Sequence, residues 1–297
     1  MSSNEFKLEG ERPQIAISRS QIEDFIRCPR CFVLEVKHGV RQPPRAPFTL
    51  NLAVEAQLKK ELDGYRQKQT VPPIVAEAGL DLRPLSHPAM DDWRKTSRGI
   101  SHNTGVFSIT GVMNDVWVDR DGQLVVVEYK ATGRTKAVTE LGYAEFYDSY
   151  RREIEIYQWL LRKNGFEVSN TAYFLYVTAT QTEDSFENVL HFESNLIAHE
   201  GSSEWIEDVL DQIQYSLDNP EVPVSSRGCE VCRFARDRTL ALAKLEEIDE
   251  LPPHCPVCDE VMSKTVYGMP SGPMATGFVS MGCIMSGDDP EWLCTKC

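Results

Sequence analysis

The sequence predicts an α/β fold in which helices flank a mixed central sheet, with a small separate module near the C-terminal end. Three observations predict it. Amphipathic segments with helical periodicity alternate with short apolar runs. Two of these runs are joined by Asp121-Gly122, a hairpin signal. Cysteines in C-x-x-C pairs occur at both ends of this region and again in the tail.

The composition is that of a globular protein. The 297 residues are 41% hydrophobic and 26% charged, which suits one large domain with one or two small modules. No uncharged apolar run approaches the ~20 residues that span a bilayer, and the first residues lack the apolar segment of a secretory signal. We therefore expect no membrane span and a cytoplasmic location.

The net charge of −14 is unevenly distributed. Residues 181–223 contain eleven acidic side chains and no Lys or Arg, and residues 240–297 contain nine acidic and three basic ones. The first 180 residues are close to neutral, with basic pairs such as Arg151 and Arg152 available to a phosphate backbone. The acidity therefore argues against a general polyanion-binding surface but leaves room for a local nucleic-acid site.

The N-terminal segment begins without structure. Residues 1–14 are polar and without periodicity, which predicts disorder. A helix then begins at Ser18 or Ser20, where Glu23 completes a capping pattern, and this helix delivers Cys28 at its end.

The elements of the predicted core follow in order. Helical periodicity over 49–66 predicts a helix with Leu52, Leu58 and Leu62 facing the interior. The remaining expected elements are strands at 105–118 and 123–130, a helix at 150–165, a strand at 171–179 and an acidic helix at 204–219.

The strand within LVVVEYKATG, residues 124–133, is unusual because four aliphatic residues are followed by charges. Alternate residues of a strand share a face, so Glu128 and Lys130 point to one side, and Val127 and Tyr129 to the other. An ion pair at a strand end is one interpretation, and it would contribute little energy. A hydrolytic site is the other, because phosphodiester hydrolysis uses oxygen ligands for a divalent metal and a nearby positive group.

Several short motifs follow one another along the chain. They are S-x-S-x-I at 18–22, CPRC at 28–31, the helix bearing Glu55, GVMND at 111–115, EYK at 128–130, the helix with Glu153 and Tyr157, and GCEVC at 228–232. Their order resembles the PD-(D/E)XK nuclease superfamily, in the branch that contains the RecB-type nuclease domain and the CRISPR-associated adaptation nucleases. The resemblance covers roughly residues 15–238 and implies a restriction-endonuclease-like core.

This resemblance assigns roles to individual residues. Glu128 and the Tyr129 carbonyl would bind Mg²⁺ or Mn²⁺ together with Glu55. Lys130 would orient the attacking water or stabilise the transition state. The alternative interpretation of Glu55 is a solvated helix residue.

Two positions depart from the superfamily's pattern. Glu153 stands where a Gln is expected. Tyr157, four residues later, fits the pattern and shares the helix face of Glu153. The alternative interpretation of Tyr157 is an aromatic residue of the core. Asn114 stands three residues after the strand glycine, where an Asp is expected, and Asp115 follows it. Asn binds Mg²⁺ less strongly than a carboxylate does. Either a β-bulge turns Asp115 toward the metal, or the site is impaired.

Four cysteines bracket the predicted core, namely Cys28, Cys31, Cys229 and Cys232. Four thiolates suit a [4Fe–4S] cluster or tetrahedral Zn²⁺, and the spacing does not choose between them. In relatives with a cluster, one early cysteine joins three late ones, whereas this chain has two of each. The resemblance favours the cluster.

The tail carries two further pairs, Cys255/Cys258 and Cys294/Cys297, with Gly and Pro between them. They resemble a zinc ribbon, in which Zn²⁺ supplies most of the folding energy of a small module. The acidic surroundings favour a protein partner over nucleic acid. Cys283 is the odd cysteine, a free thiol or a substitute ligand.

Together these observations predict a nuclease-like domain over 15–240 that contains the cysteine cluster, and a zinc-ribbon-like module over 252–297. The predicted function is metal-dependent hydrolysis of DNA in repair, recombination or defence, with single-stranded DNA or DNA with free ends as the partner. The alternative is a catalytically impaired protein of the same fold that binds DNA or protein.

Overall fold

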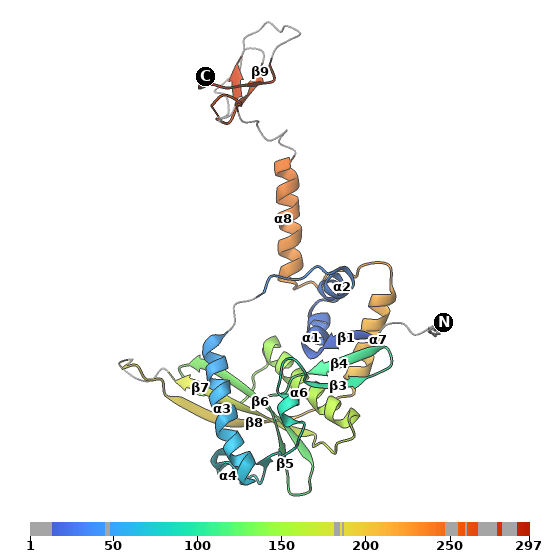
Figure 1. Ribbon diagram of the computed structural model, residues 1–297, viewed down its shortest axis with the longest axis vertical. Coiled ribbons are helices and arrows are strands. Elements are labelled where there is room, and N and C mark those ends of the chain that lie inside the picture. Colours follow the sequence, from blue (N-terminus) through green and yellow to red (C-terminus); the bar gives the residue numbers. More distant parts are fainter. Residues whose placement is uncertain are drawn as a thin grey trace, which may run out of the picture. The chain divides into compact units, whose positions relative to one another are not determined.

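The computed structural model describes residues 14–44, 48–180, 185, 187–246, 255–258, 260–266, 278–280 and 290–297 (Figure 1). The prediction of disorder over 1–14, apart from Gln14, and the predictions for Cys283 lie outside the described residues. The chain divides into two compact units, residues 1–231 and 232–297. In the described part of the chain, no helix is long and apolar enough to cross a membrane.

A five-stranded sheet forms the centre of the first unit. Its strand order is β2-β5-β6-β7-β8. The strands are β2 (Arg83–Pro84), β5 (Asp115–Val118), β6 (Leu124–Arg134), β7 (Thr171–Thr180) and β8 (Phe192–Glu200). β6 and β7 run parallel, and the other neighbours are antiparallel. The predicted mixed central sheet is therefore confirmed.

The β5–β6 hairpin forms where Asp121-Gly122 predicts it. Asp119 Oδ1 accepts hydrogen bonds from the backbone N–H groups of Asp121 and Gln123, at 2.9 and 2.8 Å. Gly122 has a φ of +85°, which glycine adopts without steric cost. This turn sets the register in which Asp115 lies opposite Val127.

Helices cover both faces of this sheet (Figure 1). On one face, α3 (Thr49–Lys68) and α4 (Pro73–Glu77) pack on an apolar cluster that includes Trp117 and Val127. On the other face, α6 (Glu145–Lys163) packs on a larger cluster that includes Val126. Because side chains alternate along β6, Glu128 and Lys130 lie on the α6 face with Val126.

The predicted strand over 105–118 is in fact two strands in two different sheets. The first, β4 (Phe107–Gly111), lies between β1 (Ile15–Ser18) and β3 (Ile100–Asn103), and the second is β5. Gly111, the last residue of β4, lies against α6. A Cβ atom at Gly111 would lie only 2.8 Å from Tyr157 Cε1.

Four helices complete the first unit: α1 (Arg19–Arg27), α2 (Pro29–His38), α5 (Met90–Trp93) and α7 (Trp205–Asp218). The cap of α1 is Ser18, but its partner is Gln21 rather than Glu23. Ser18 Oγ accepts from the Gln21 N–H at 3.2 Å, and Gln21 Oε1 accepts from the Ser18 N–H at 3.0 Å. Glu23 instead forms an ion pair with Arg152 of α6.

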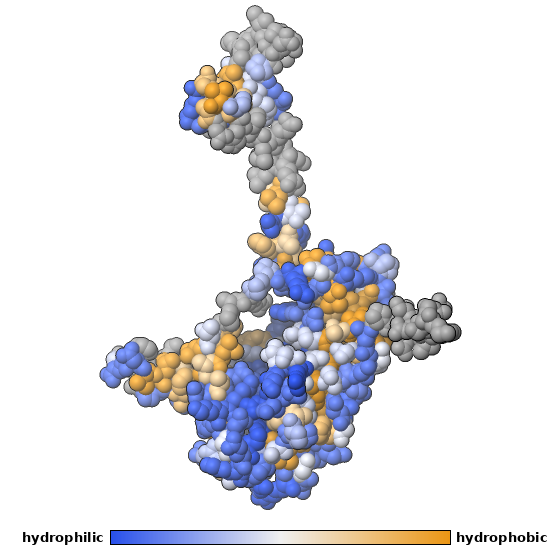
Figure 2. Space-filling model, in the orientation of Figure 1, coloured by the Kyte–Doolittle hydropathy of each residue, from blue (hydrophilic) through white to orange (hydrophobic). Residues whose placement is uncertain are grey.

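The apolar face of α3 is shorter than its sequence predicts. Leu62 is 3% exposed, as expected, whereas Leu52 is 55% exposed. The packing of α3 against the sheet is concentrated at Leu58, Leu62 and Tyr65, so the first turns of the helix bury little. The surface over α3 and α4 is mainly polar, and apolar side chains gather at the outer ends of β7 and β8 (Figure 2).

The second unit contains a small sheet with the order β10-β9-β11. Its strands are β9 (Ser263–Val266), β10 (Phe278–Ser280) and β11 (Trp292–Leu293). A helix that the sequence did not predict, α8 (Glu230–Glu246), begins at the end of the first unit and continues into the second. The domain boundaries at 240 and 252 stay predictions.

Candidate active site

A cavity opens beside β6 where its neighbour β5 begins. Asp115, the first residue of β5, pairs with Val127, and the ladder between the two strands goes no further toward Lys130. Two asparagine side chains bind this edge instead. Asn114 Oδ1 accepts from the Tyr129 N–H at 2.8 Å, and Asn51 Nδ2 donates to the Ala131 carbonyl at 2.9 Å.

This opening is a cavity of about 250 Å³. It brings together residues of α3, β6 and α6 with the residue that precedes β5. The polar residues that line it are Asn51, Glu55, Asn114, Glu128, Tyr129, Lys130 and Tyr150. Of the residues to which the sequence assigns catalytic or nuclease-metal roles, Glu55, Asn114, Glu128, Tyr129 and Lys130 therefore lie at one cavity.

Charged side chains of alternating sign form a row at this site. Lys130 Nζ lies 3.0 Å from Glu128 Oε1 and 2.7 Å from Glu153 Oε2. Glu153 Oε1 lies 2.6 Å from Arg19 Nη2. Glu153 is buried and Arg19 is partly buried, so each carboxylate has a fixed cation beside it. The row runs from β6 through α6 to the first residue of α1.

Burial and these neighbours shift the ionisation of the row. Burial of the Glu128 carboxyl group raises its pKa to about 7, against the opposing effect of the Lys130 charge. For Glu153, burial acts in the same direction, but the charges of Lys130 and Arg19 outweigh it and lower the pKa. Burial alone would lower the pKa of Lys130, but Glu128 and Glu153 raise it, so Lys130 is protonated at neutral pH.

Glu55 lies across the cavity from β6, on α3. Its Oε1 accepts hydrogen bonds from Asn114 Nδ2 at 2.9 Å and from Lys59 Nζ at 2.5 Å. Asn114 thus uses both ends of its amide, because its oxygen already accepts from the Tyr129 N–H. The side chain of Asn114 connects the helix that carries Glu55 with the strand that carries Glu128.

The structure places Asp115 away from the cavity, contrary to the bulge that the sequence allows. β5 pairs with β6 in continuous register from Asp115 to Val118, so Asp115 lies on the same face as Val127 and points away from Glu128. Asp115 is fully buried. Its carboxylate accepts hydrogen bonds from Arg66, Tyr129 Oη, Trp117 Nε1 and the Val116 N–H. These four donors satisfy the buried carboxylate, which indicates that Asp115 has a structural role.

Tyr157 lies behind the row of charges rather than in the cavity. Its hydroxyl group donates to the Val112 carbonyl at 2.8 Å and lies 3.4 Å from Glu153 Oε1. The ring is buried against Gly111. Tyr157 therefore fixes α6, and with it Glu153, to the turn between β4 and β5.

The oxygen atoms at the cavity fit a divalent cation. Glu128 Oε2 is buried and has no hydrogen-bond partner among the residues that the structure describes, which is costly for a carboxylate unless a cation or water binds it. The N–H and C=O groups of a residue in a strand point to the same side, so the Tyr129 carbonyl faces the same opening as its N–H. Carboxylate, amide and carbonyl oxygens are the ligands that Mg²⁺ and Mn²⁺ prefer.

Two residues at the site were not found from the sequence. Arg19 follows the helix cap Ser18 and has no periodicity or motif that indicates a partner on α6. Tyr150 lines the cavity, and its ring centroid lies 4.4 Å from Lys130 Nζ. Its place in the first turns of α6, one turn before Glu153, is a signal that could have found it.

The family is decided by comparison with known proteins. The model of the PD-(D/E)XK nuclease superfamily matches residues 49–236. The chain belongs to the PD-(D/E)XK nuclease superfamily. Among solved structures, the crystal structure of SSO0001 is 14% identical, with a TM-score of 0.35, and the match covers 71% of this chain and 81% of that one. No curated protein matches the chain.

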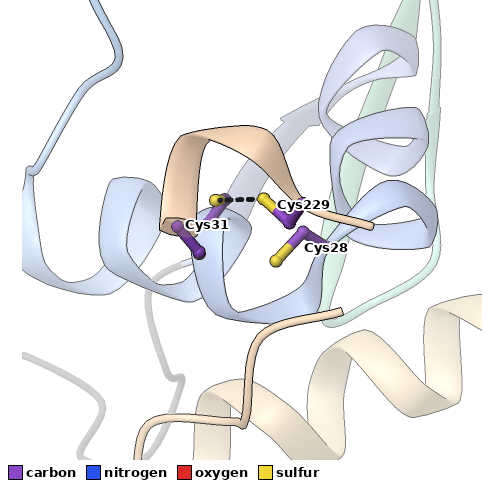
Figure 3. A group of neighbouring side chains, drawn as sticks. Cys28, Cys31 and Cys229 are labelled. Carbon is purple, nitrogen blue, oxygen red and sulfur yellow. Dashed lines mark hydrogen bonds between the residues drawn. The ribbon is translucent and has the colours of Figure 1, made fainter. Parts of the chain in front are cut away.

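This member of the PD-(D/E)XK nuclease superfamily also has a group of four cysteines that could hold a metal ion. The sulfur atoms of Cys28, Cys31, Cys229 and Cys232 lie within 4.8 Å of one another. Figure 3 shows three of them, with Cys31 Sγ and Cys229 Sγ 3.5 Å apart. Cys28 joins α1 to α2. Although burial raises the pKa of its thiol, backbone hydrogen bonds at Cys31 and Ser226 outweigh it and lower the pKa to about 7.

A second group of four cysteines lies between residues 255 and 297. The sulfur atoms of Cys255, Cys258, Cys294 and Cys297 also lie within 4.8 Å of one another. Hydrogen bonds from the backbone N–H groups of Cys297 and Lys296 lower the pKa of Cys294 to about 6. Both groups that the sequence assigns to metal are therefore assembled, in geometry suited to a metal such as zinc.

Proposed function

We propose that this chain is a divalent-metal-dependent nuclease that hydrolyses DNA phosphodiester bonds, in repair, recombination or defence. The observation that carries the proposal is the convergence of Glu128 and Lys130 from β6 with Glu55 and Asn114 on one cavity. Membership of the superfamily supports a nuclease-type activity on nucleic acid.

The metal would be Mg²⁺ or Mn²⁺, held by Glu128, Glu55, the Asn114 side-chain oxygen and the Tyr129 carbonyl. When bound, such a cation would neutralise phosphate charge and lower the pKa of a water molecule beside the scissile phosphate. The unpartnered Glu128 Oε2 supports this assignment, because its burial without a donor is explained by a cation at the cavity. Asp115 is not included, because its oxygens already accept from four donors.

Lys130 would act on the phosphoryl group. Its ammonium group is held between Glu128 and Glu153, with the Tyr150 ring beside it, so its position at the cavity wall is restricted. A fixed positive charge next to the scissile phosphate stabilises the negative charge that develops on the phosphoryl oxygens, and it needs no reorganisation during the reaction.

The two cysteine groups would hold metals with structural roles. We assign a [4Fe–4S] cluster, with Zn²⁺ as the other candidate, to Cys28, Cys31, Cys229 and Cys232. We assign Zn²⁺ to the second group, in a zinc-ribbon-like module that contacts a protein partner. The close approach of four thiol sulfurs supports both assignments. Closing a loop of about 200 residues would fix the α1–α2 junction to Cys229 and Cys232, at the start of α8.

A second candidate function is binding without catalysis. It is favoured by Asn114, whose neutral amide stands where the superfamily pattern has an Asp and is engaged by Glu55 and the Tyr129 N–H. In that case the fold would serve a DNA- or protein-binding subunit.

Cleavage of end-labelled single- and double-stranded DNA tests the proposal. The wild-type protein is expected to cut in Mn²⁺ or Mg²⁺, to be inactive in EDTA, and to lose activity on Glu128→Gln substitution, which keeps the size of the side chain but removes its charge. DNA binding without cutting in any metal would establish the second candidate instead.

A further inference from the structure

Three aromatic rings lead out of the catalytic cavity along the first turns of α6. They are Tyr150, Tyr147 and Phe146, here called the aromatic ladder. Tyr150 lines the cavity beside Lys130. The ring centroid of Phe146 lies 5.9 Å from that of Tyr150 and 4.0 Å from that of Tyr147. The ladder therefore connects the phosphate-binding end of the site with the surface.

The outer end of this ladder is open to solvent. Tyr147 is buried, whereas Phe146 is 46% exposed. An apolar ring that stays in water at the rim of a polar cavity gives up the free energy of burial. Because Phe146 packs edge-on or tilted against two other rings, its orientation is fixed without any need for a ligand.

The basic residues Arg134 and Lys136 follow Lys130 along the chain. Arg134, the last residue of β6, lies on the same face of the strand as Lys130. Arg134 and Lys136 are exposed, and neither forms an ion pair with any residue that the structure describes. Glu140 and Glu145 in the same segment weaken the positive field, so charge alone is insufficient for tight binding.

Stacking of bases on aromatic rings would add binding energy to the weak electrostatic attraction. Single-stranded nucleic acids bind where aromatic side chains alternate with basic groups, because every base has a flat π-face. In a duplex each base is already stacked between its neighbours and would have to be extruded. An exposed ring whose centroid lies 5.9 Å from that of Tyr150, which lines the cavity, thus matches an unpaired base next to the phosphate being cut.

We propose that Phe146, supported by Tyr147 and Tyr150, is a stacking site for an unpaired base of single-stranded DNA whose backbone enters the cavity past Arg134 and Lys136. This inference rests on the proposed function, since it takes the cavity as the site of phosphodiester cleavage. It names the substrate class as single strands and places the first base contact on α6.

Binding measured in EDTA tests the stacking site separately from cleavage. The fluorescence anisotropy of a labelled oligo-dT strand is followed with full-length wild-type protein and with Phe146→Ala, Phe146→Leu and Phe146→Trp variants. Ala and Leu are expected to weaken binding by about tenfold, and Trp to retain it. Tyr215→Ala, an exposed aromatic of α7, serves as the matched control and should bind as the wild type does.

Phe146→Leu distinguishes stacking from apolar packing, because Leu keeps the apolar volume but has no π-face. The wild type should bind an oligonucleotide of the same length with abasic sites as weakly as Phe146→Leu binds oligo-dT. The affinity of Phe146→Leu for the abasic oligonucleotide should be no lower than its affinity for oligo-dT. Wild-type affinity of Phe146→Leu for oligo-dT, or equal affinity of the wild type for abasic and intact strands, would overturn the inference. Failure of the proposed function is measured separately, because the wild type would then not cut DNA in Mn²⁺, whatever the binding measured in EDTA.

Discussion

Arg19 and Glu153 form an ion pair, with 2.6 Å between Nη2 and Oε1, at the point where α1 meets α6 beside the candidate catalytic cavity. The second oxygen of Glu153 binds Lys130 at 2.7 Å. Glu153 is thus shared between two cations, one from the first turn of α1 and one from β6. The position of the Lys130 ammonium group depends on a residue that does not line the cavity.

Arg19→Ala should therefore lower kcat for DNA cleavage by about 10- to 100-fold with little change in KM, as is typical when the partner of a catalytic group is removed. Without Arg19, Glu153 interacts with Lys130 alone, so the Lys130 ammonium group should lie closer to Glu153 and farther from the phosphate. Arg19→Lys should retain most of the activity, because it keeps the charge. Steady-state kinetics of the three proteins measure this.

The double variant Arg19→Ala with Glu153→Gln should lose less kcat for DNA cleavage than the sum of the losses in the two single variants, each expressed as a free energy. Each single change leaves a partly buried charge without its partner, and the double change removes both. Strictly additive losses would show that the pair has no energetic coupling.

Asn114→Asp should strengthen metal binding and weaken the metal-free protein. The new carboxylate would face Glu55, to which Asn114 now donates at 2.9 Å, so repulsion should lower the melting temperature in EDTA. A cation between the two carboxylates reverses this effect, because a ligand that binds the folded state stabilises it. Thermal unfolding with and without Mn²⁺ should show a larger metal-induced rise for the variant than for the wild type. An equal rise would exclude Asn114 from the metal site.

Asp115→Ala should destabilise the fold by about 3–5 kcal/mol, because it removes the buried acceptor of Arg66 Nη2 and of the Trp117 and Tyr129 side-chain donors, although Arg66 keeps its ion pair with Asp63. Asp91→Ala, at an exposed position of α5, should change stability by less than about 0.5 kcal/mol. Urea denaturation measures both. A destabilisation of Asp115→Ala as small as that of Asp91→Ala would contradict the structural role.

The metal of each cysteine group should respond only to changes in that group. Cys31→Ser should abolish the visible absorption of anaerobically purified protein and its iron, and should leave about one zinc per chain. Cys258→Ser should have the opposite effect. Metal analysis beside the absorption spectrum decides the assignment, and stoichiometric zinc without a visible band in the wild type would replace the cluster by a second zinc.

Local patterns predicted much of the fold and part of the site. The apolar run before Glu128, the Asp-Gly turn and the amphipathic helices each act over a few residues, so the mixed sheet follows from them. The alternation of faces along β6 also correctly placed Glu128 and Lys130 together.

Contacts between distant segments could not be predicted in the same way. The split of 105–118 places β4 between β1 and β3 and β5 in the five-stranded sheet, and the buried carboxylate of Asp115 pairs with Arg66 of α3. Arg19 meets Glu153 only because α1 packs on α6. None of these pairs leaves a local periodicity, since each is decided by tertiary packing.

Single-turnover cleavage of end-labelled single-stranded DNA in Mn²⁺ by the wild type, Lys130→Ala and Lys163→Ala tests the catalytic assignment most directly. Lys163 lies at the other end of α6, where it pairs with Glu207, and serves as the matched control. Equal rates for the wild type and Lys163→Ala, with a rate at least about 100-fold lower for Lys130→Ala, are the predicted result. Cleavage by Lys130→Ala at the wild-type rate, or no cleavage by the wild type despite DNA binding, would contradict it.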